Sequence, residues 1–382
     1  MRIKKKIIFL IANDPLYFQQ HLFYIVNSLI KERKFKVYLL SNNKSVLKLK
    51  IPNGAVYLPI PITRKPNLIS DIKALIKLLF LIFDKKPQIL LSFTHKGGLL
   101  ATIATTIFRN SYFHVHTFTG QIWPNMKGNR RRFYKLIDKF IAYNSNLALA
   151  DSCYQAEFLN ENLCLRKKVI GLELGSLSGI DFLRFNNKNN KYSKGLSSGN
   201  GLRYIFLGRI TLAKGVGDLI TIIPKHLKDF SKDTFTFVGP CEDIILFQKL
   251  KDLSIDFPQN VFLKGFVEFQ EIYLKQSNIL ILPSRREGFC NTVIEAGACG
   301  VPTIAYEIYG IKNAIKNNIT GLLAKPFSQK DFATLMRKCS QNKEMVQELS
   351  KEAESYAKNF SYKKRTEIFL NTIVNNSHIK FI

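Results

Sequence analysis

The chain has 382 residues, which is too long for one compact core and predicts two domains of roughly 150 to 200 residues each. Hydrophobic residues make up 46% of the chain, which favours a folded globular protein over a disordered one. The 57 Lys and Arg against 28 Asp and Glu give a net charge of +29. That charge favours nucleic acid, anionic membranes or anionic substrates as partners, without choosing among them.

The N-terminal segment looks like a signal peptide because three lysines, at positions 4 to 6, precede an apolar stretch. That stretch covers only residues 7–12 and is followed by Asn13-Asp14-Pro15 rather than by a small-residue cleavage site. We interpret it as a first buried parallel strand. The longest apolar segment, residues 74–83, is interrupted by a lysine and has about half the length needed to span a bilayer, so no transmembrane helix is expected.

Apolar runs alternate with helical patterns along the first half of the chain, and this alternation predicts a doubly wound parallel sheet. The expected strands are 7–12, 37–40, 89–92 and 113–117, followed by the short strands 147–150 and 169–172; the expected helices lie near 18–31, 71–83 and 97–108.

Residues 186–201 contain almost nothing that could be buried, which is typical of a linker or a long surface loop. After this segment the alternation resumes. We therefore predict an α/β fold of two tandem Rossmann-like doubly wound domains that face each other across a cleft. The domains should cover residues 1–190 and 201–360, and a C-terminal helix, about 361–382, is expected to pack back on the first domain. The expected strands of the second domain are 203–207, 234–238, 261–263, 279–282 and 303–305.

Two basic residues follow the strand 203–207, in the motifs Gly208-Arg209 and Lys214-Gly215. Glycine lets the backbone approach a ligand closely, while Arg binds a phosphate as a planar fork and Lys binds it as a point charge. The arrangement suits a diphosphate, although it lacks the spacing of a P-loop. The alternative is a pair of solvated side chains around an ordinary turn.

Two carboxylates flank a second loop. Glu287 closes the loop after the strand 279–282, and Glu295 lies about one and a half turns into a helix that begins near Asn291. The N-terminus of that helix would attract a phosphate, which the carboxylates would repel unless they face neutral hydroxyl groups of the same ligand. A sugar nucleotide has that layout, with a diphosphate between two hydroxylated rings. The presence of this acidic loop beside the basic loop favours ligand binding by Arg209 and Lys214 over the alternative of a solvated turn.

In combination these motifs resemble the retaining glycosyltransferases of family 4, which have the GT-B architecture. The resemblance covers nearly the whole second half of the chain and the end of the first. It is closest to bacterial enzymes that build O-antigen, capsule or other lipid-linked surface glycans. The residues that carry it are Gly208-Arg209, Lys214-Gly215, Pro283-Ser284, Arg286-Glu287-Gly288-Phe289, Asn291, Glu295-Ala296, Cys299-Gly300-Val301-Pro302, Gly310, Gly321-Leu322-Leu323, Gly179-Ile180-Asp181 and Arg184-Phe185, together with the phrases 94–98 and 116–123.

The resemblance implies a sugar nucleotide, UDP-linked, as co-substrate and no cofactor. Arg209, Lys214 and Glu287 would be the catalytic residues: the two cations would hold the donor diphosphate, and Glu287 would bind hydroxyls of the transferred sugar. Glu295 would bind the ribose hydroxyls. The other donor-binding residues would be Gly208, Gly288, Phe289, Asn291 and Thr292.

No divalent metal is expected, because no Asp-x-Asp motif occurs and the two basic residues would take the part that Mg²⁺ plays elsewhere. His114 and His116 share one face of a predicted strand but have no further ligand types nearby, which argues against a metal site there.

The first half departs from the family pattern. Many members have a glycine-rich loop after the first strand, where this chain has Asn13, and a His before a Gly after the strand 113–117, where it has Thr119. Either His116 takes that role or the role is lost; alternatively His116 is a strand histidine satisfied by a backbone carbonyl. His95, on a strand-to-helix loop, is expected to contact the acceptor or the donor phosphate. These four residues are the candidates on the acceptor or donor side.

Residues 127–143 predict a basic amphipathic helix, which either lies on a membrane surface or has a core-facing apolar side and solvated charges. A lipid-linked acceptor favours the membrane. We therefore expect a hexosyl- or N-acetylhexosaminyltransferase, peripheral on the inner face of the bacterial cell membrane. It would act on a polyprenyl-diphosphate-linked glycan in surface polysaccharide biosynthesis. A nucleotide-sugar 2-epimerase is the alternative enzyme. A nucleic-acid binder is disfavoured because no recognised module is found.

Overall fold

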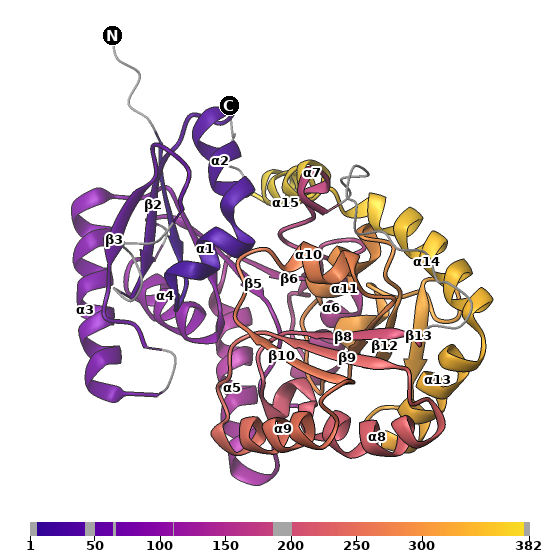
Figure 1. Cartoon of the computed structure of the whole chain (residues 1–382). Coiled ribbons are helices and arrows are strands. Elements are labelled where there is room, and N and C mark those ends of the chain that lie inside the picture. Colours follow the sequence, from indigo (N-terminus) through magenta and orange to yellow (C-terminus); the bar gives the residue numbers. More distant parts are fainter. Residues whose placement is uncertain (1–5, 43–49, 64–65, 110, 186–200, 378–382) are drawn as a thin grey trace. The chain divides into compact units, whose positions relative to one another are not determined.

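The computed structural model describes residues 6–42, 50–63, 66–109, 111–185 and 201–377 (Figure 1). The chain divides into two compact units, one formed by Met1–Gly179 with Tyr362–Ile382 and the other by Ile180–Ser361. The C-terminal segment therefore groups with the first unit, and the division falls ahead of the expected boundary at residue 190. Apart from Gly201, the expected linker lies outside the described residues.

The first unit is built on a parallel sheet of seven strands in the order β3-β2-β1-β4-β5-β6-β7. Its central strands are buried on both faces, as expected for a parallel sheet covered by helices. The short strand β3 was not predicted, because its ends are exposed and it lies at the sheet edge. The strands are β1 (Ile7–Ile11), β2 (Lys36–Ser41), β3 (Val56–Pro59), β4 (Ile89–Phe93), β5 (Phe113–Phe118), β6 (Leu147–Ala150) and β7 (Ile170–Gly171).

Helices cover both faces of this sheet. Alternate residues of β1 face opposite layers: Ile8 and Leu10 pack in the core with α1, α2 and α15, and Phe9 and Ile11 pack in the core with α3 and α4. The helices are α1 (Pro15–His21), α2 (Phe23–Lys31), α3 (Leu68–Lys85), α4 (His95–Ile107), α5 (Gly128–Asn144), α6 (Cys153–Leu163) and α15 (Tyr362–Asn375).

The helix expected near 18–31 is instead two helices. The first begins earlier because Pro15 occupies its first turn and the Asp14 carboxylate accepts a hydrogen bond from the Leu16 amide at 2.9 Å. It ends at Leu22, which has non-helical dihedral angles of −118° and 2°, and α2 starts at Phe23.

The second unit contains a parallel sheet of six strands in the order β10-β9-β8-β11-β12-β13. The edge strand β13 was not predicted, because its residues were recognised only as the motif Gly321-Leu322-Leu323. The strands are β8 (Arg203–Leu207), β9 (Thr234–Val238), β10 (Val261–Gly265), β11 (Ile279–Leu282), β12 (Thr303–Tyr306) and β13 (Gly321–Ala324). The helices are α7 (Phe182–Phe185), α8 (Val216–Asp229), α9 (Ile244–Asp256), α10 (Gln270–Lys275), α11 (Asn291–Ala298), α12 (Tyr309–Lys312), α13 (Gln329–Gln341) and α14 (Lys343–Ala357).

Each sheet has a point where the strand order reverses, between β1 and β4 in the first unit and between β8 and β11 in the second. Ligands of open α/β sheets bind outside the carboxyl ends of the strands at such points. The loops after β8 and β11 carry the two motifs singled out above, so the topology of the second unit brings them together.

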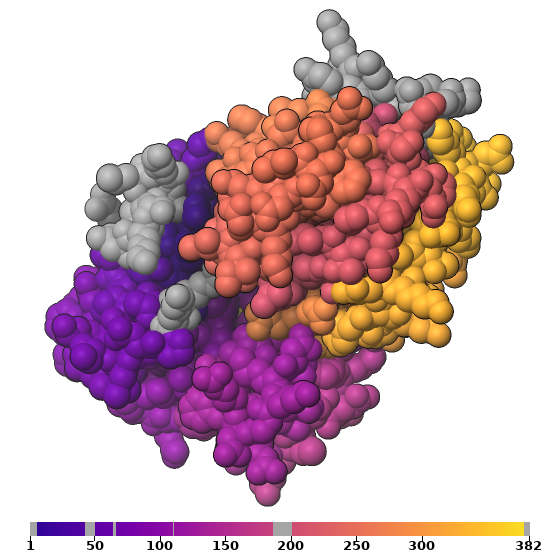
Figure 2. Space-filling view, turned by 60° about the horizontal axis from the view of Figure 1, so that its bottom comes forward, coloured from indigo at the N-terminus to yellow at the C-terminus, as the bar shows by residue number. Residues whose placement is uncertain are grey.

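Helices α3, α4 and α5 form one layer of the first unit, since α3 packs beside α4 and α4 beside α5. In the space-filling view the purple surface of this layer continues into the magenta surface of α5 (Figure 2). Among the described residues, no helix is long and apolar enough to cross a membrane.

Candidate functional site

The basic loop after β8 and the acidic loop after β11 meet through one ion pair. The Lys214 ammonium donates a hydrogen bond to Oε1 of Glu287 at 2.6 Å. Both side chains are mostly buried, with 19% and 11% of their surfaces exposed. Two residues far apart in the sequence are thus held side by side at the switch point of the sheet.

Backbone contacts fix the two loops against each other. Gly215 has φ of 73°, and a Cβ atom on it would collide with the carbonyl oxygen of Pro283. The Arg285 amide donates to the Ala213 carbonyl at 2.9 Å. On the other side of the acidic loop, a Cβ atom on Gly310 would collide with the backbone of Glu287. Glycine is required at both positions because another segment of backbone approaches closely.

Charges on the neighbouring residues act on Lys214. Burial lowers the pKa of its ammonium, but the Coulombic attraction and the hydrogen bond of Glu287 outweigh this effect and raise the pKa overall. Arg209 is close enough to oppose that rise, although its own guanidinium pairs with Glu242 at 2.7 Å. Lys214 is therefore a fixed positive charge, whereas Arg209 is 37% exposed and makes an ion pair that a ligand could replace.

Helix α11 begins at the predicted residue, Asn291, directly after this loop. Cys290 at its N-cap is buried, and burial followed by the charge of Glu287 raises the pKa of its thiol to about 12. The phenyl ring of Phe289 is also buried, where it packs on Phe360. Of the predicted donor-binding residues, Phe289 can therefore reach a ligand only through its backbone, while Asn291 and Thr292 are partly exposed.

Glu295 lies in a different set of contacts. Its Oε2 accepts a hydrogen bond from the Gln270 amide at 2.9 Å. Burial raises the pKa of this carboxyl to about 7, although the positive charge of Arg184 opposes the rise. Arg184 in turn pairs with Glu271 at 2.9 Å. The sequence did not indicate Gln270 or Glu271, because nothing in their local pattern marks them as neighbours of α11.

Asp218, in the first turn of α8, connects three elements around the site and was also missed. Its carboxylate accepts two hydrogen bonds at 2.9 Å from Arg285 of the acidic loop. It accepts further bonds from the Tyr306 hydroxyl at 2.9 Å and the Gln329 amide at 2.8 Å. A buried carboxylate with four such bonds is well satisfied and holds the acidic loop against α8, β12 and α13.

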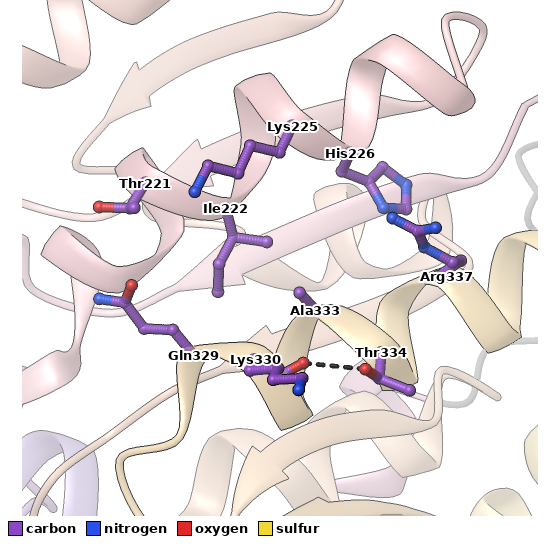
Figure 3. A pocket seen from close by; sticks show the side chains of 9 residues that line it. All are labelled: Thr221, Ile222, Lys225, His226, Gln329, Lys330, Ala333, Thr334 and Arg337. Carbon is purple, nitrogen blue, oxygen red and sulfur yellow. Dashed lines mark hydrogen bonds between the residues drawn. The ribbon is translucent and has the colours of Figure 1, made fainter.

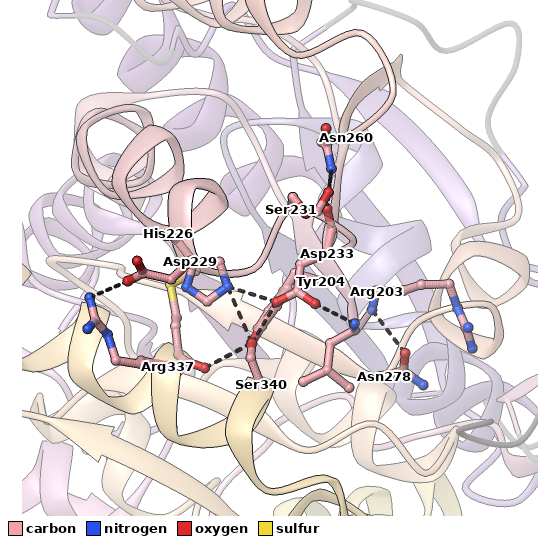
Figure 4. A network of polar contacts seen from close by, with 12 residues as sticks. Arg203, Tyr204, His226, Asp229, Ser231, Asp233, Asn260, Asn278, Arg337 and Ser340 are labelled. Atoms are coloured by element: carbon pink, nitrogen blue, oxygen red, sulfur yellow. Dashed lines mark hydrogen bonds and ion pairs between the residues drawn. The ribbon is translucent and has the colours of Figure 1, made fainter. Parts of the chain in front are cut away.

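Other prominent polar features of the second unit lie apart from this ion pair. A cavity of about 650 Å³ opens between α8 and α13, and no residue predicted for the site lines it (Figure 3). A buried network joins His226 and Ser340 to the Asp233 carboxylate, at 2.8 and 2.6 Å (Figure 4). Asp233 precedes β9, so the network lies at the amino ends of the strands and stabilises the edge away from Lys214.

In the first unit, Asn13 follows β1 at the switch point. Its Oδ1 accepts hydrogen bonds from the Thr94 hydroxyl at 2.8 Å and from the Gly97 amide at 3.2 Å. Thr94 has φ of 65°, a left-handed conformation that is uncommon for a β-branched residue. The Asn13 side chain thus holds the strained start of α4, which is a positioning role.

His95 is the first residue of α4 rather than part of the preceding loop. Its Nδ1 lies 2.9 Å from Oδ1 of Asp138, a buried carboxylate of α5 whose other oxygen accepts from the Trp123 indole at 2.8 Å. No described residue pairs with Nε2 of His95. The imidazole is therefore oriented by a carboxylate, and 22% of the side chain remains exposed.

His116 is buried within β5, with 1% of its surface exposed. The alternative of a strand histidine satisfied by a backbone carbonyl is right in its burial and wrong in its partner: Nδ1 bonds the Ser92 hydroxyl at 2.8 Å, and the ring fills the space left by the missing side chain of Gly98. Burial lowers the pKa of this imidazole well below its usual value, so it is neutral. Thr119, after β5, is partly exposed and hydrogen-bonds Tyr17. Of these two candidates, Thr119 has surface available to a ligand.

His114 bonds the same Ser92 hydroxyl, at 2.8 Å, and burial lowers the pKa of its imidazole to about 3. The two strand histidines are therefore joined by a hydroxyl group. The described residues contain no group of three side chains that could hold a metal ion.

Comparison with solved structures identifies the fold. The chain matches sucrose-phosphate synthase from Thermosynechococcus elongatus with a TM-score of 0.80 and 15% identity, over 97% of this chain and 99% of the other. It matches Anabaena Alr3699/HepE, solved in complex with UDP-glucose, with a TM-score of 0.75 and 15% identity, over 97% and 100% of the two chains. Its two Rossmann-like domains thus have the GT-B fold of glycosyltransferases, as predicted.

The sequence of the second unit is similar to a described family. Residues 187–356, less than half of the chain, match the family described as glycosyl transferases group 1. The capsular polysaccharide biosynthesis glycosyltransferase CapM of Staphylococcus aureus is 28% identical over 315 residues, 81% of each chain. The uncharacterized glycosyltransferase MJ1178 of Methanocaldococcus jannaschii is 28% identical over 229 residues, 59% of this chain and 58% of the relative.

Proposed function

We propose that this protein is a retaining glycosyltransferase of family 4 that transfers a hexosyl or N-acetylhexosaminyl group from a UDP-linked sugar. The acceptor is a polyprenyl-diphosphate-linked glycan, and the product enters a bacterial surface polysaccharide such as capsule or O-antigen. Support comes from the motifs of the second unit, from the similarity to CapM, whose name assigns it to capsule biosynthesis, and from the UDP-glucose complex of the Anabaena protein. The group 1 match favours sugar transfer over the epimerase alternative.

The observation that carries the proposal is the Lys214–Glu287 pair at the switch point of the second sheet. A diphosphate needs a fixed cation, and a sugar ring needs a hydrogen-bond acceptor next to it. Lys214, assisted by Arg209, would neutralise the charge that builds on the departing nucleoside diphosphate. Glu287 would accept hydrogen bonds from hydroxyls of the transferred sugar and at the same time hold the ammonium in place.

Glu295 would bind the ribose. Its carboxyl is buried beside Gln270, and Arg184 supplies a compensating charge. A pair of vicinal hydroxyls can donate to the two oxygens of a carboxylate, and a buried acceptor gains most from such bonds because an unpaired one is costly.

In a reaction that retains configuration, the acceptor hydroxyl attacks the anomeric carbon on the face from which the diphosphate departs. The C–O bond to the diphosphate breaks as the new glycosidic bond forms, and the departing phosphate oxygen takes the proton of the acceptor hydroxyl. No strong side-chain base is needed. We propose a metal-independent reaction because Lys214 and Arg209 supply the positive charge that the leaving group requires.

The acceptor lipid places the enzyme on the inner face of the cell membrane. Helix α5 carries exposed apolar residues at helical spacing, Phe133, Leu136, Phe140 and Tyr143, and its first turns carry three consecutive arginines. This composition is typical of a helix that lies in an anionic lipid interface.

The proposal is tested by incubating the protein with a panel of nucleotide sugars and extracted polyprenyl-linked acceptors, in the presence and absence of a chelator, with products identified by mass spectrometry. We expect one sugar to be transferred from a UDP-linked donor, in a chelator-resistant reaction that preserves the anomeric configuration. Conversion of the nucleotide sugar to an epimer without any acceptor would contradict the proposal.

A further inference from the structure

Helix α3 carries an apolar stripe on its solvent side that the sheet does not use. Ile69, Ile72, Ile76, Phe80 and Phe83 follow one another at intervals of three or four residues, so they share one face of the helix. Each of them is between 49% and 69% exposed. The opposite face supplies Ala74, Leu78, Leu81 and Ile82 to the core.

Such a stripe is unusual on a protein surface. Single exposed apolar side chains are common, but a continuous row of five large ones marks a surface that binds something apolar. At 1.5 Å per residue the 18 residues of α3 extend over roughly 27 Å, so the stripe is long enough to act as a line of contact.

The charges around the stripe indicate the nature of the partner. Lys73 and Lys77 flank it and are exposed, while the two acids of the helix are paired, Asp71 with Lys96 at 2.7 Å and Asp84 with Lys85 at 2.8 Å. The surface beside the apolar row is therefore basic. Two copies of this face would bring lysines together, whereas an anionic lipid surface complements both the apolar row and the lysines.

Helix α5, two positions along the same layer, has an outward stripe of the same kind. A single amphipathic helix binds a bilayer weakly, and a second contact on the same rigid body adds to it without further loss of rotational freedom. We propose that α3 is a membrane-docking helix, which together with α5 seats the first unit on an anionic bilayer. This inference rests on the proposed function, because it names the surface that brings the enzyme to its lipid-linked acceptor.

The test is flotation of the full-length protein with phosphatidylcholine vesicles that contain or lack phosphatidylglycerol, without donor or acceptor. We expect binding only to the anionic vesicles. The variant Ile69→Gln, Ile76→Gln, Phe80→Gln should weaken this binding by roughly tenfold or more, because three inserted side chains are replaced by polar ones. Glutamine is a good helix former, so exposed substitutions should leave folding intact, which thermal unfolding would check.

A matched control is available on α9 of the second unit, where Ile244, Ile245 and Ile255 are more exposed than the three substituted residues of α3. Replacing these three by Gln should leave vesicle binding unchanged. Lys73→Glu with Lys77→Glu should weaken the preference for anionic vesicles while the apolar row is intact.

Vesicle binding by the α3 variant at the wild-type level would overturn the inference, and so would a wild-type protein that ignores vesicles but self-associates through α3. The UDP affinity of the wild type and of the α3 variant, measured by calorimetry in solution, separates the two proposals, and the α3 variant should keep the wild-type UDP affinity. A wild type that binds UDP but not the anionic vesicles contradicts only the membrane role, whereas a wild type that binds these vesicles but not UDP contradicts only the proposed function.

Discussion

Gly310 lies directly against the backbone of Glu287, so the acidic loop after β11 packs on a residue without a side chain. The contact excludes every residue except glycine from position 310 and fixes the position of the acidic loop. Any Cβ atom at position 310 would displace the Glu287 carbonyl, and with it the carboxylate that pairs with Lys214. The geometry of the proposed donor site therefore depends on a residue that carries no functional group.

Gly310→Ala should shift the Glu287 loop, lower the transfer rate by tenfold or more and destabilise the protein by about 1 to 3 kcal/mol, as overpacking does. Steady-state kinetics and thermal unfolding measure the two effects. Gly217→Ala is the control, because a Cβ atom there would make only ordinary contact, 3.7 Å from Leu246, inside helix α8. Equal behaviour of the two variants would mean that the close approach at position 310 does not position the loop.

Lys214→Met should reduce kcat by about two to three orders of magnitude, since a preorganised charge that stabilises a leaving group has that effect. Methionine keeps most of the length of the side chain and removes its charge. Lys249→Met, on the exposed side of α9, removes a lysine remote from the site and should have no effect. Metal addition should not restore Lys214→Met; restoration by Mg²⁺ would show that the lysine and a cation are interchangeable and would contradict metal-independent transfer.

Glu295 gives a pH dependence whose sign can be derived. Burial raises the pKa of its carboxyl from 4.5 to about 7 in the folded protein. Between these values the folded state binds the proton more tightly than the unfolded state, so stability falls as pH rises from about 4.5 to about 7. Glu295→Gln removes this penalty and should be more stable than the wild type at pH 8, by about 1 to 3 kcal/mol, with little difference at pH 4.5.

Denaturant unfolding at both pH values measures this difference. The same carboxyl should bind the ribose better when ionised, so UDP affinity of the wild type should rise through about pH 7 and that of Glu295→Gln should not. A pH-independent UDP affinity in the wild type would argue against Glu295 as the ribose ligand.

Asp218→Ala should destabilise the second unit by about 3 to 5 kcal/mol, because it leaves the buried Tyr306 hydroxyl and the partly buried Gln329 amide without this acceptor and removes two hydrogen bonds of Arg285. Thermal unfolding would show this loss. Asp229→Ala is a suitable comparison, since Asp229 forms a half-exposed ion pair with Arg337 and should contribute little.

The sequence predicted what depends on local pattern. The strands β8 and β11, the start of α11 and the loops with Lys214 and Glu287 could be located because apolar runs, glycines and charges mark them along the chain. Their meeting at a switch point followed from general rules for parallel sheets.

What could not be predicted depends on contacts between distant segments. The hydrogen bonds that Asp218 accepts join three elements. The partner of His116 is a hydroxyl from the neighbouring strand β4 rather than a backbone carbonyl. The pairing of Arg209 with Glu242 likewise gives no local signal. These contacts depend on how side chains pack in the folded protein, and the hydrophobic periodicity of the sequence carries no information about that packing.

In the proposed reaction, Glu287 binds the transferred sugar while Lys214 and Arg209 hold the diphosphate. This division of roles is tested by titrating UDP into Glu287→Ala and Lys214→Met by calorimetry, alongside transfer assays with the UDP-sugar. We predict that Glu287→Ala binds UDP nearly as the wild type does but transfers no sugar, whereas Lys214→Met loses UDP affinity by roughly tenfold or more. Normal transfer by Glu287→Ala would contradict the account.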